Sequence, residues 1–190
     1  MRPFPLLTAL SIAFLGLATV AGAQEKEGMS PKAKIAEAVS AGPAELATNA
    51  AVVDWDGTVL REGSNGWTCF PDVKDSPGTD PMCLDQQWMK WADAWVNKKD
   101  ATGVTEIGIG YMLRGGYDAS NTDPYATGPA EGDDWIRSGP HLMVITPDAA
   151  ALDNLPTDPK SGGPWVMWKG TPFAHIMVPI SGPKAMKHKH

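Results

Sequence analysis

The chain has 190 residues, of which 43% are hydrophobic, and its 16 basic and 22 acidic side chains give a formal net charge of −6. Proteins that bind nucleic acids or anionic membrane surfaces use a basic field to neutralise phosphates, so this acidic balance argues against both classes of partner. The length fits one domain, since domains usually hold about 100–200 residues.

The first recognisable element is an apolar segment at the N-terminus. Arg2 supplies one positive charge, residues 6–20 are almost entirely apolar, and the small residues Ala21–Ala23 follow. This layout is typical of a secretory signal peptide over 1–23 that is cleaved before Gln24. An uncleaved anchor is the alternative, but the run is shorter than the roughly 20 residues of a membrane span. We therefore predict a periplasmic or secreted protein that keeps no integral membrane segment after cleavage.

The mature chain, 167 residues long, keeps 15 of the basic residues and all 22 acidic ones, a formal charge of −7. Residues 24–180 are predicted to form a single globular domain. Residues 181–190 carry no apolar pattern and end with His188 and His190, so we expect a flexible basic tail.

Residues 31–40 are predicted to form a short helix, because Ser30 can cap it and Pro31 occupies its first position. From residue 51 the pattern becomes strand-like. Two turn signals, Asp56-Gly57 and Asn65-Gly66, separate β-prone runs and predict a three-stranded meander over 51–70.

The two cysteines, Cys69 and Cys83, flank a stretch rich in Pro and Gly. An even number of cysteines in an oxidising compartment favours a disulfide, and the alternative is a reactive thiol or a metal ligand. We expect the bridge to pin an irregular loop over 71–81.

Asp85 can cap a helix that runs to about residue 97. Within it, Trp88, Trp91 and Trp95 recur at helical spacing and share one stripe. Such a stripe usually packs against a sheet, and the alternative is a platform on which a sugar or another small ligand stacks.

Residues 105–113 alternate as a strand with Gly108 and Gly110 on one face, where a neighbouring element can approach closely. Residues 115–134 are predicted to form a long loop. Its oxygen-bearing side chains suggest calcium as one ligand, and a solvated turn cluster is the alternative.

The remainder predicts strands over 141–146, 165–169 and 173–180, and a short helix over 148–152. The chain is therefore expected to form an α+β domain. Its mostly antiparallel sheet would have about six or seven strands, with two or three helices packed on it and one disulfide.

The strongest candidate for chemistry is a His-x-Met pair that occurs twice, in His141–Met143 and His175–Met177. Alternate residues of a strand share one face, so each segment presents an imidazole beside a thioether. If the two strands are neighbours, these four side chains line one patch, and their chemistry suits copper, above all Cu(I). The alternative is that the methionines fill the core and each histidine is hydrogen-bonded.

In this local respect, over six residues, the chain resembles the copper-handling proteins of the bacterial periplasm, in which His-x-Met pairs serve as copper ligands. It departs from the Met-rich clusters common in such proteins, because Met82, Met112 and Met167 are scattered along the sequence.

Two other functions remain open. The eight tryptophans suit a non-catalytic binding module for a small organic ligand or a carbohydrate. A small hydrolase-like enzyme could use His141 or His175 as its base, with an acidic or lysine partner. The residues considered for that partner are Asp72, Asp85, Asp123 and Lys169.

Overall fold

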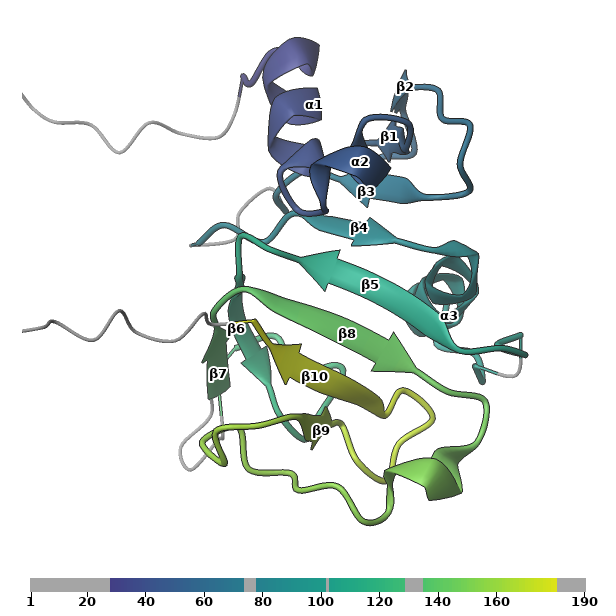
Figure 1. The fold of residues 1–190 in the computed structure, drawn as a ribbon, viewed down its shortest axis with the longest axis vertical. Helices are drawn as coiled ribbons and strands as arrows, with labels where there is room; N and C mark the ends of the chain where they lie inside the picture. Colours follow the sequence, from purple (N-terminus) through teal and green to yellow (C-terminus); the bar gives the residue numbers. More distant parts are fainter. Residues whose placement is uncertain (1–27, 74–77, 102, 129–134, 181–190) are drawn as a thin grey trace, which may run out of the picture.

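The computed structural model describes residues 28–73, 78–101, 103–128 and 135–180 (Figure 1). The predicted signal peptide, its cleavage site and the tail over 181–190 lie outside these ranges. Among the described residues, no helix has both the length and the apolar character needed to cross a membrane.

The described chain folds around one large sheet and a separate two-stranded sheet. Eight strands form the large sheet in the order β2-β1-β3-β4-β5-β8-β10-β9. The predicted α+β class and the mostly antiparallel sheet are confirmed, whereas the expected number of six or seven strands is wrong. The strands of the large sheet are β1 (Ala51–Val53), β2 (Val59–Arg61), β3 (Thr68–Phe70), β4 (Met82–Leu84), β5 (Gly108–Met112), β8 (His141–Ile145), β9 (Trp165–Met167) and β10 (His175–Pro179).

The helices cover the two faces of the large sheet unequally. The elements are α1 (Pro31–Val39), α2 (Ala44–Ala47), α3 (Gln86–Val96) and the 3-10 turn η1 (Ala149–Leu152). Ser30 caps α1, as its sequence indicates, and the Asp85 carboxylate accepts from the Trp88 amide at the start of α3. One face is packed by α1 and α2 over β1, β3 and β4, and the other by α3 over β4 and β5.

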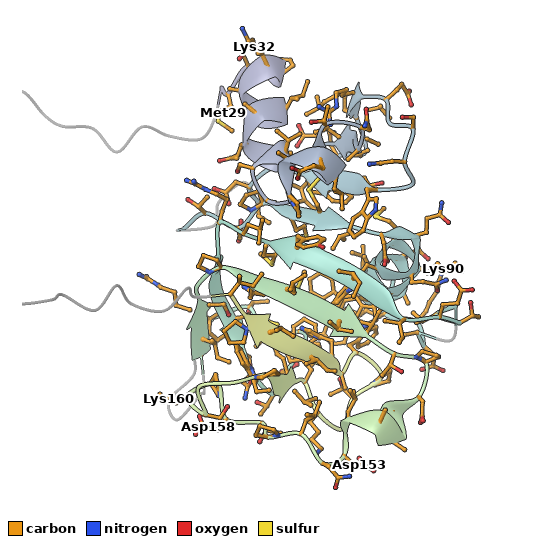
Figure 2. All side chains as sticks on the ribbon, viewed as in Figure 1. Met29, Lys32, Lys90, Asp153, Asp158 and Lys160 are labelled. Carbon is orange, nitrogen blue, oxygen red and sulfur yellow. A yellow bond between two sulfur atoms is a disulfide. The ribbon has the colours of Figure 1, made fainter. Side chains whose placement is uncertain are left out.

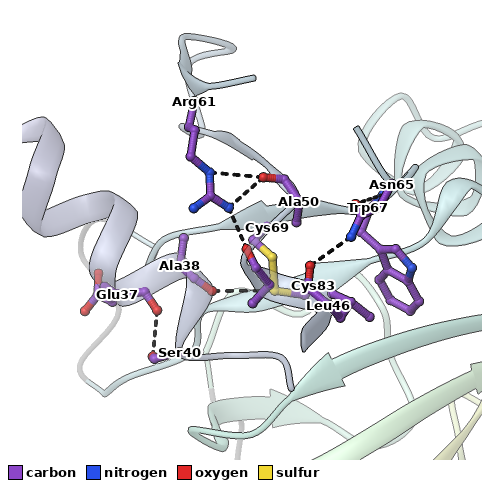
Figure 3. Close-up of a disulfide and its surroundings, with 11 residues drawn as sticks. Glu37, Ala38, Ser40, Leu46, Ala50, Arg61, Asn65, Trp67, Cys69 and Cys83 are labelled. Atoms are coloured by element: carbon purple, nitrogen blue, oxygen red, sulfur yellow. Dashed lines mark hydrogen bonds between the residues drawn. A yellow bond between two sulfur atoms is a disulfide. The ribbon is translucent and has the colours of Figure 1, made fainter. Parts of the chain in front are cut away.

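The predicted meander over 51–70 is wrong in its order. β2 pairs with β1 in antiparallel fashion, but β3 returns to the other side of β1 and pairs with it in parallel. The segment between β2 and β3 is held across the end of β1 by hydrogen bonds to the α2 region. In this segment, Asn65 Nδ2 donates to the Leu46 carbonyl, and Arg61 at the end of β2 donates to the carbonyls of Ala47 and Ala50 (Figure 3).

The predicted disulfide between Cys69 and Cys83 is present, and both residues are fully buried (Figure 3). It joins directly paired residues of β3 and β4 and packs under α1, where Cys83 Sγ lies 3.6 Å from the Ala38 carbonyl oxygen. The two cysteines therefore belong to paired strands and flank the stretch over 71–81, in which the described residues form no helix or strand.

Gly108 and Gly110 permit the close approach that their strand pattern predicts. A Cβ atom on Gly108 would lie 2.7 Å from an Ile145 side-chain carbon, and one on Gly110 would lie 2.9 Å from Met143 Cε. The Gly110 position would also be 3.4 Å from Trp88 Nε1. The two glycines therefore let α3 and the β8 side chains pack directly on β5.

The expected loop over 115–134 is wrong at its start. Gly116–Ser120 forms strand β6, which pairs with β7 (Trp135–Ser138) in the second sheet. Two of the oxygen-bearing residues considered for calcium have structural partners: Asn121 bonds Thr157 and Trp165, and Asp123 accepts from the Tyr125 amide. Residues 129–134 lie outside the described chain.

Candidate functional site

The two His-x-Met segments lie on neighbouring strands, β8 and β10. These strands are antiparallel, and their register pairs Met177 with Met143 and Pro179 with His141. His141 and Met143 alternate with Leu142, and His175 and Met177 alternate with Ile176, so all four His and Met side chains share one face. All four are buried, whereas the residues between them are only partly buried.

Because the strands are antiparallel, the two histidines lie at opposite ends of the methionine pair. The register separates His141 from His175 by four residues, about 13 Å along the strands. An approximate two-fold axis, normal to the sheet, therefore passes between Met143 and Met177. A single ion held directly by both imidazoles does not suit this register, which instead creates two half-sites with one histidine each.

Two further methionines, which look scattered in the sequence, complete the same arrangement. Met112 of β5 is the direct cross-strand partner of His141, and Met167 of β9 is the direct partner of His175. Both are buried. We call this set the His/Met face, and its members are Met112, His141, Met143, Met167, His175 and Met177. Each half therefore contains one imidazole and two neighbouring thioethers.

His141 carries the most informative atom of the face. Its side chain is 2% exposed, and its Nδ1 lies 2.7 Å from the Gly139 carbonyl oxygen. A carbonyl can only accept, so Nδ1 bears the proton and Nε2 keeps its lone pair. That Nε2 atom is buried and has no hydrogen-bond partner. Burial lowers the pKa of His141 although the Gly139 bond opposes the shift, so the imidazole is neutral at pH 7.

A small unfilled space lies beside His141. A Cβ atom built on Gly116 would lie 3.6 Å from His141 Cε1 and 3.4 Å from Met112 Cε. These are ordinary contact distances, so the missing Cβ leaves a methyl-sized gap next to both side chains. The gap and the flexible thioether give this half-site room to rearrange.

His175 is surrounded by aromatic side chains. Its Nδ1 is 2.9 Å from the Phe173 carbonyl oxygen, and the rings of Trp88, Trp91 and Trp168 meet its ring nearly edge-on, with centroids 5.1 to 5.6 Å away. Burial lowers the pKa of His175 to about 4, the Phe173 bond opposes this shift, and repulsion from His141 in its protonated form adds to it. Trp168 has a positive φ of 56°, which is strained for a tryptophan, and its stacking on Trp91 accompanies that conformation.

The donors of the His/Met face are chemically selective. The described residues contain no group of three or more His, Cys, Asp or Glu side chains that could hold a metal ion. Any metal on this face would therefore depend on thioether sulfur together with imidazole. Thioethers are soft ligands that suit Cu(I), and the face offers no carboxylate for Ca²⁺ or Mg²⁺.

The tryptophan stripe of α3 packs toward the sheet. Trp88 and Trp91 are 2% and 6% exposed, and only Trp95 is partly exposed. A surface recess near this helix, about 440 Å³, is lined by other α3 residues and the segment that follows them. A ligand could stack on Trp88 or Trp91 only after the core opened, so the stripe presents no ready platform in this conformation.

The residues considered as partners for a histidine base are engaged elsewhere. Asp85 caps α3, and its second oxygen accepts from the Ile109 amide. Asp72 accepts from the Asp80 amide, Asp123 from the Tyr125 amide, and Lys169 donates to the Asp153 carbonyl. The printed hydrogen bonds of both histidine rings go to backbone carbonyls, so none of these four residues pairs with His141 or His175 in this structure.

The comparisons with known proteins found no matching family model, no matching curated protein and no matching solved structure. The case for function therefore depends on the geometry of the chain itself. Sequence reasoning missed Met112 and Met167, although both belong to predicted strands, because the pairing of those strands with the His-x-Met strands was not known.

Proposed function

We propose that this protein binds Cu(I) through the His/Met face, with His141, Met112 and Met143 as the primary site. The observation that carries the proposal is the buried, unpartnered Nε2 atom of His141 beside thioethers. A buried acceptor without a partner lowers the stability of the fold by about 1–3 kcal/mol. The presence of such an atom therefore favours a ligand that binds to it. His175, Met167 and Met177 form the symmetry-related second site.

The protonation state of the site supports the same function. Metal binding to histidine requires the neutral ring, and protons compete with the metal where the pKa lies near the ambient pH. Burial holds the pKa values of both histidines below the ordinary 6.5. Both imidazoles are therefore ready to act as ligands at neutral pH without first losing a proton.

The predicted export fits this function, and we include it in the proposal. The buried disulfide supports export, because such bonds persist in oxidising compartments such as the periplasm. In that setting, a soft site that excludes water would keep Cu(I) apart from other reactants.

The direct test is an anaerobic Cu(I) titration against a competing chromogenic chelator. The protein should end at Ile180, because His188 and His190 in the tail could bind copper without a folded site. Wild type should compete for at least one equivalent of Cu(I). His141→Ala should lose the tightest equivalent, and His141→Ala combined with His175→Ala should lose all binding.

Methionine variants provide a milder test. Met112→Leu removes a thioether while nearly conserving volume, so it should weaken Cu(I) binding and leave the fold intact. Met89→Leu is the matched control, because Met89 lines the surface recess of α3 and lies outside the His/Met face. Unchanged affinity in Met112→Leu and in the double histidine variant, with cooperative unfolding retained, would contradict the proposal.

A further inference from the structure

The two halves of the His/Met face offer the same donors but differ in the space around them. Three indole rings surround His175, with centroids 5.1 to 5.6 Å from its own. His141 instead has Gly116 as a neighbour, the first residue of β6, which lies beside the beginning of β8 in Figure 1. A ligand at His141 therefore adjoins a residue without a side chain, whereas a ligand at His175 adjoins bulky rings.

The primary site lies in a densely packed interior. In Figure 2 side chains crowd the interior around the large sheet, and the labelled charged residues lie at the periphery. His141 itself is 2% exposed. Protein interiors are packed about as densely as organic crystals and contain few voids. An ion that enters this interior must therefore displace side chains or use a gap that the fold already contains.

The position of the missing Cβ of Gly116 is such a gap, and it lies beside two donor residues. A Cβ atom there would be 3.6 Å from His141 Cε1, 3.4 Å from Met112 Cε and 4.0 Å from Met112 Sδ. All three are ordinary contact distances, so alanine would fit the metal-free structure. The φ of Gly116 also lies outside the left-handed region that favours glycine. Glycine weakens the interior of a strand, so its presence here calls for a reason other than backbone conformation.

Met112 is the neighbour of the gap that can move most readily. Its unbranched side chain has three rotatable bonds and adapts to irregular space. Its methyl carbon is the heavy atom nearest to the vacant position, so rotation about the Cγ–Sδ bond can carry that methyl group into the gap. The same rotation redirects the lone pairs of the sulfur and can turn one of them towards an ion at His141 Nε2, the buried atom without a partner.

We propose, on the basis of the copper function above, that Gly116 is a positioning residue of the primary site. The space that it leaves receives the methyl group of Met112 when Cu(I) binds between Met112 Sδ and His141 Nε2. The same space explains why the His141 half-site is the tighter one. The indole rings around His175 are rigid, with two rotatable bonds each, and give way less easily to an ion.

The test compares metal-free stability with Cu(I) affinity in the full mature chain, with His188 and His190 of the tail both replaced by alanine. Gly116→Ala should unfold at the same or a higher urea concentration than its parent, because alanine meets only ordinary contacts and restricts the unfolded chain. Its affinity for Cu(I) at the tightest equivalent should fall by at least about tenfold. Gly128→Ala is the matched control, since its Cβ would meet nothing within 4 Å, and it should keep the parent's affinity.

A second background shows whether the added methyl group acts through Met112. In Met112→Leu no thioether is left to reposition, so Gly116→Ala should lower the affinity there by less than about threefold. An equal loss in both backgrounds would overturn the proposal, and so would a Gly116→Ala protein that is less stable than its parent, because the gap would then not exist. A parent that binds Cu(I) and a Gly116→Ala variant that binds it equally well would overturn the role of Gly116 alone. A parent that fails to compete for Cu(I) would overturn this role together with the copper function.

Discussion

The buried histidines should make the metal-free protein lose stability in mild acid. The pKa of His175 is about 4 in the folded protein, against an ordinary value of 6.5. The unfolded chain therefore binds more protons between these values, so stability is complete above pH 6.5 and falls as the pH drops towards 4. For His175 alone, the loss reaches about 2 kcal/mol by pH 5 and about 3 kcal/mol by pH 4. His141 adds to it in the same direction.

The measurement is urea unfolding followed by tryptophan fluorescence, at intervals from pH 8 to pH 4.5. The window above pH 5 is the informative one, because ordinary carboxyl groups titrate mainly below it. His175→Asn is the matched variant, since its amide nitrogen can take the position of Nδ1 and donate to the Phe173 carbonyl. It lowers the stability at every pH, but it should flatten the pH dependence.

The test is the change in the free energy of unfolding between pH 6.5 and pH 5. This change does not depend on the absolute stability of either protein. A wild-type protein whose unfolding free energy stays constant across this window would refute the reasoning. So would a His175→Asn variant with the slope of the wild type, since the titrating group would then lie elsewhere.

Three further results are expected. Gly110→Ala should destabilise the protein by about 1–3 kcal/mol in urea unfolding, because its Cβ would press on Met143 Cε at 2.9 Å, whereas Gly128→Ala meets nothing within 4 Å and should be nearly neutral. Reduction of the buried disulfide should cost about 3 kcal/mol by the same assay, and thiol labelling of the denatured, unreduced protein should give no signal. Intact-mass analysis of exported protein should find a chain that starts at or near Gln24, and retention of residues 1–23 would contradict the predicted cleavage.

Local signals in the sequence were sufficient for several elements of the fold. The Ser30 and Asp85 caps, the tryptophan spacing of α3 and the two strand glycines each depend on nearby residues, and each is confirmed. The order of β1, β2 and β3 in the sheet could not be predicted from such local signals. Turn signals at Asp56-Gly57 and Asn65-Gly66 do not determine the side of β1 to which β3 returns, because contacts with the α2 region decide it.

In the candidate site too, the sequence predicted the local features but not those that depend on strand pairing. Strand periodicity placed each histidine on the same face as the methionine two residues later. The register was not accessible from periodicity, and it determines that His141 and His175 lie at opposite ends of the methionine pair. The contributions of Met112 and Met167 also depend on pairings between strands that are distant in the sequence.

The central claim, that the His/Met face binds Cu(I), is tested most directly by X-ray absorption spectroscopy of the copper-loaded protein ending at Ile180. The proposed ligands predict a Cu(I) edge and a first coordination shell that contains both imidazole nitrogen and thioether sulfur, with less sulfur in Met112→Leu. A first shell of nitrogen and oxygen alone, with no sulfur, would contradict the account.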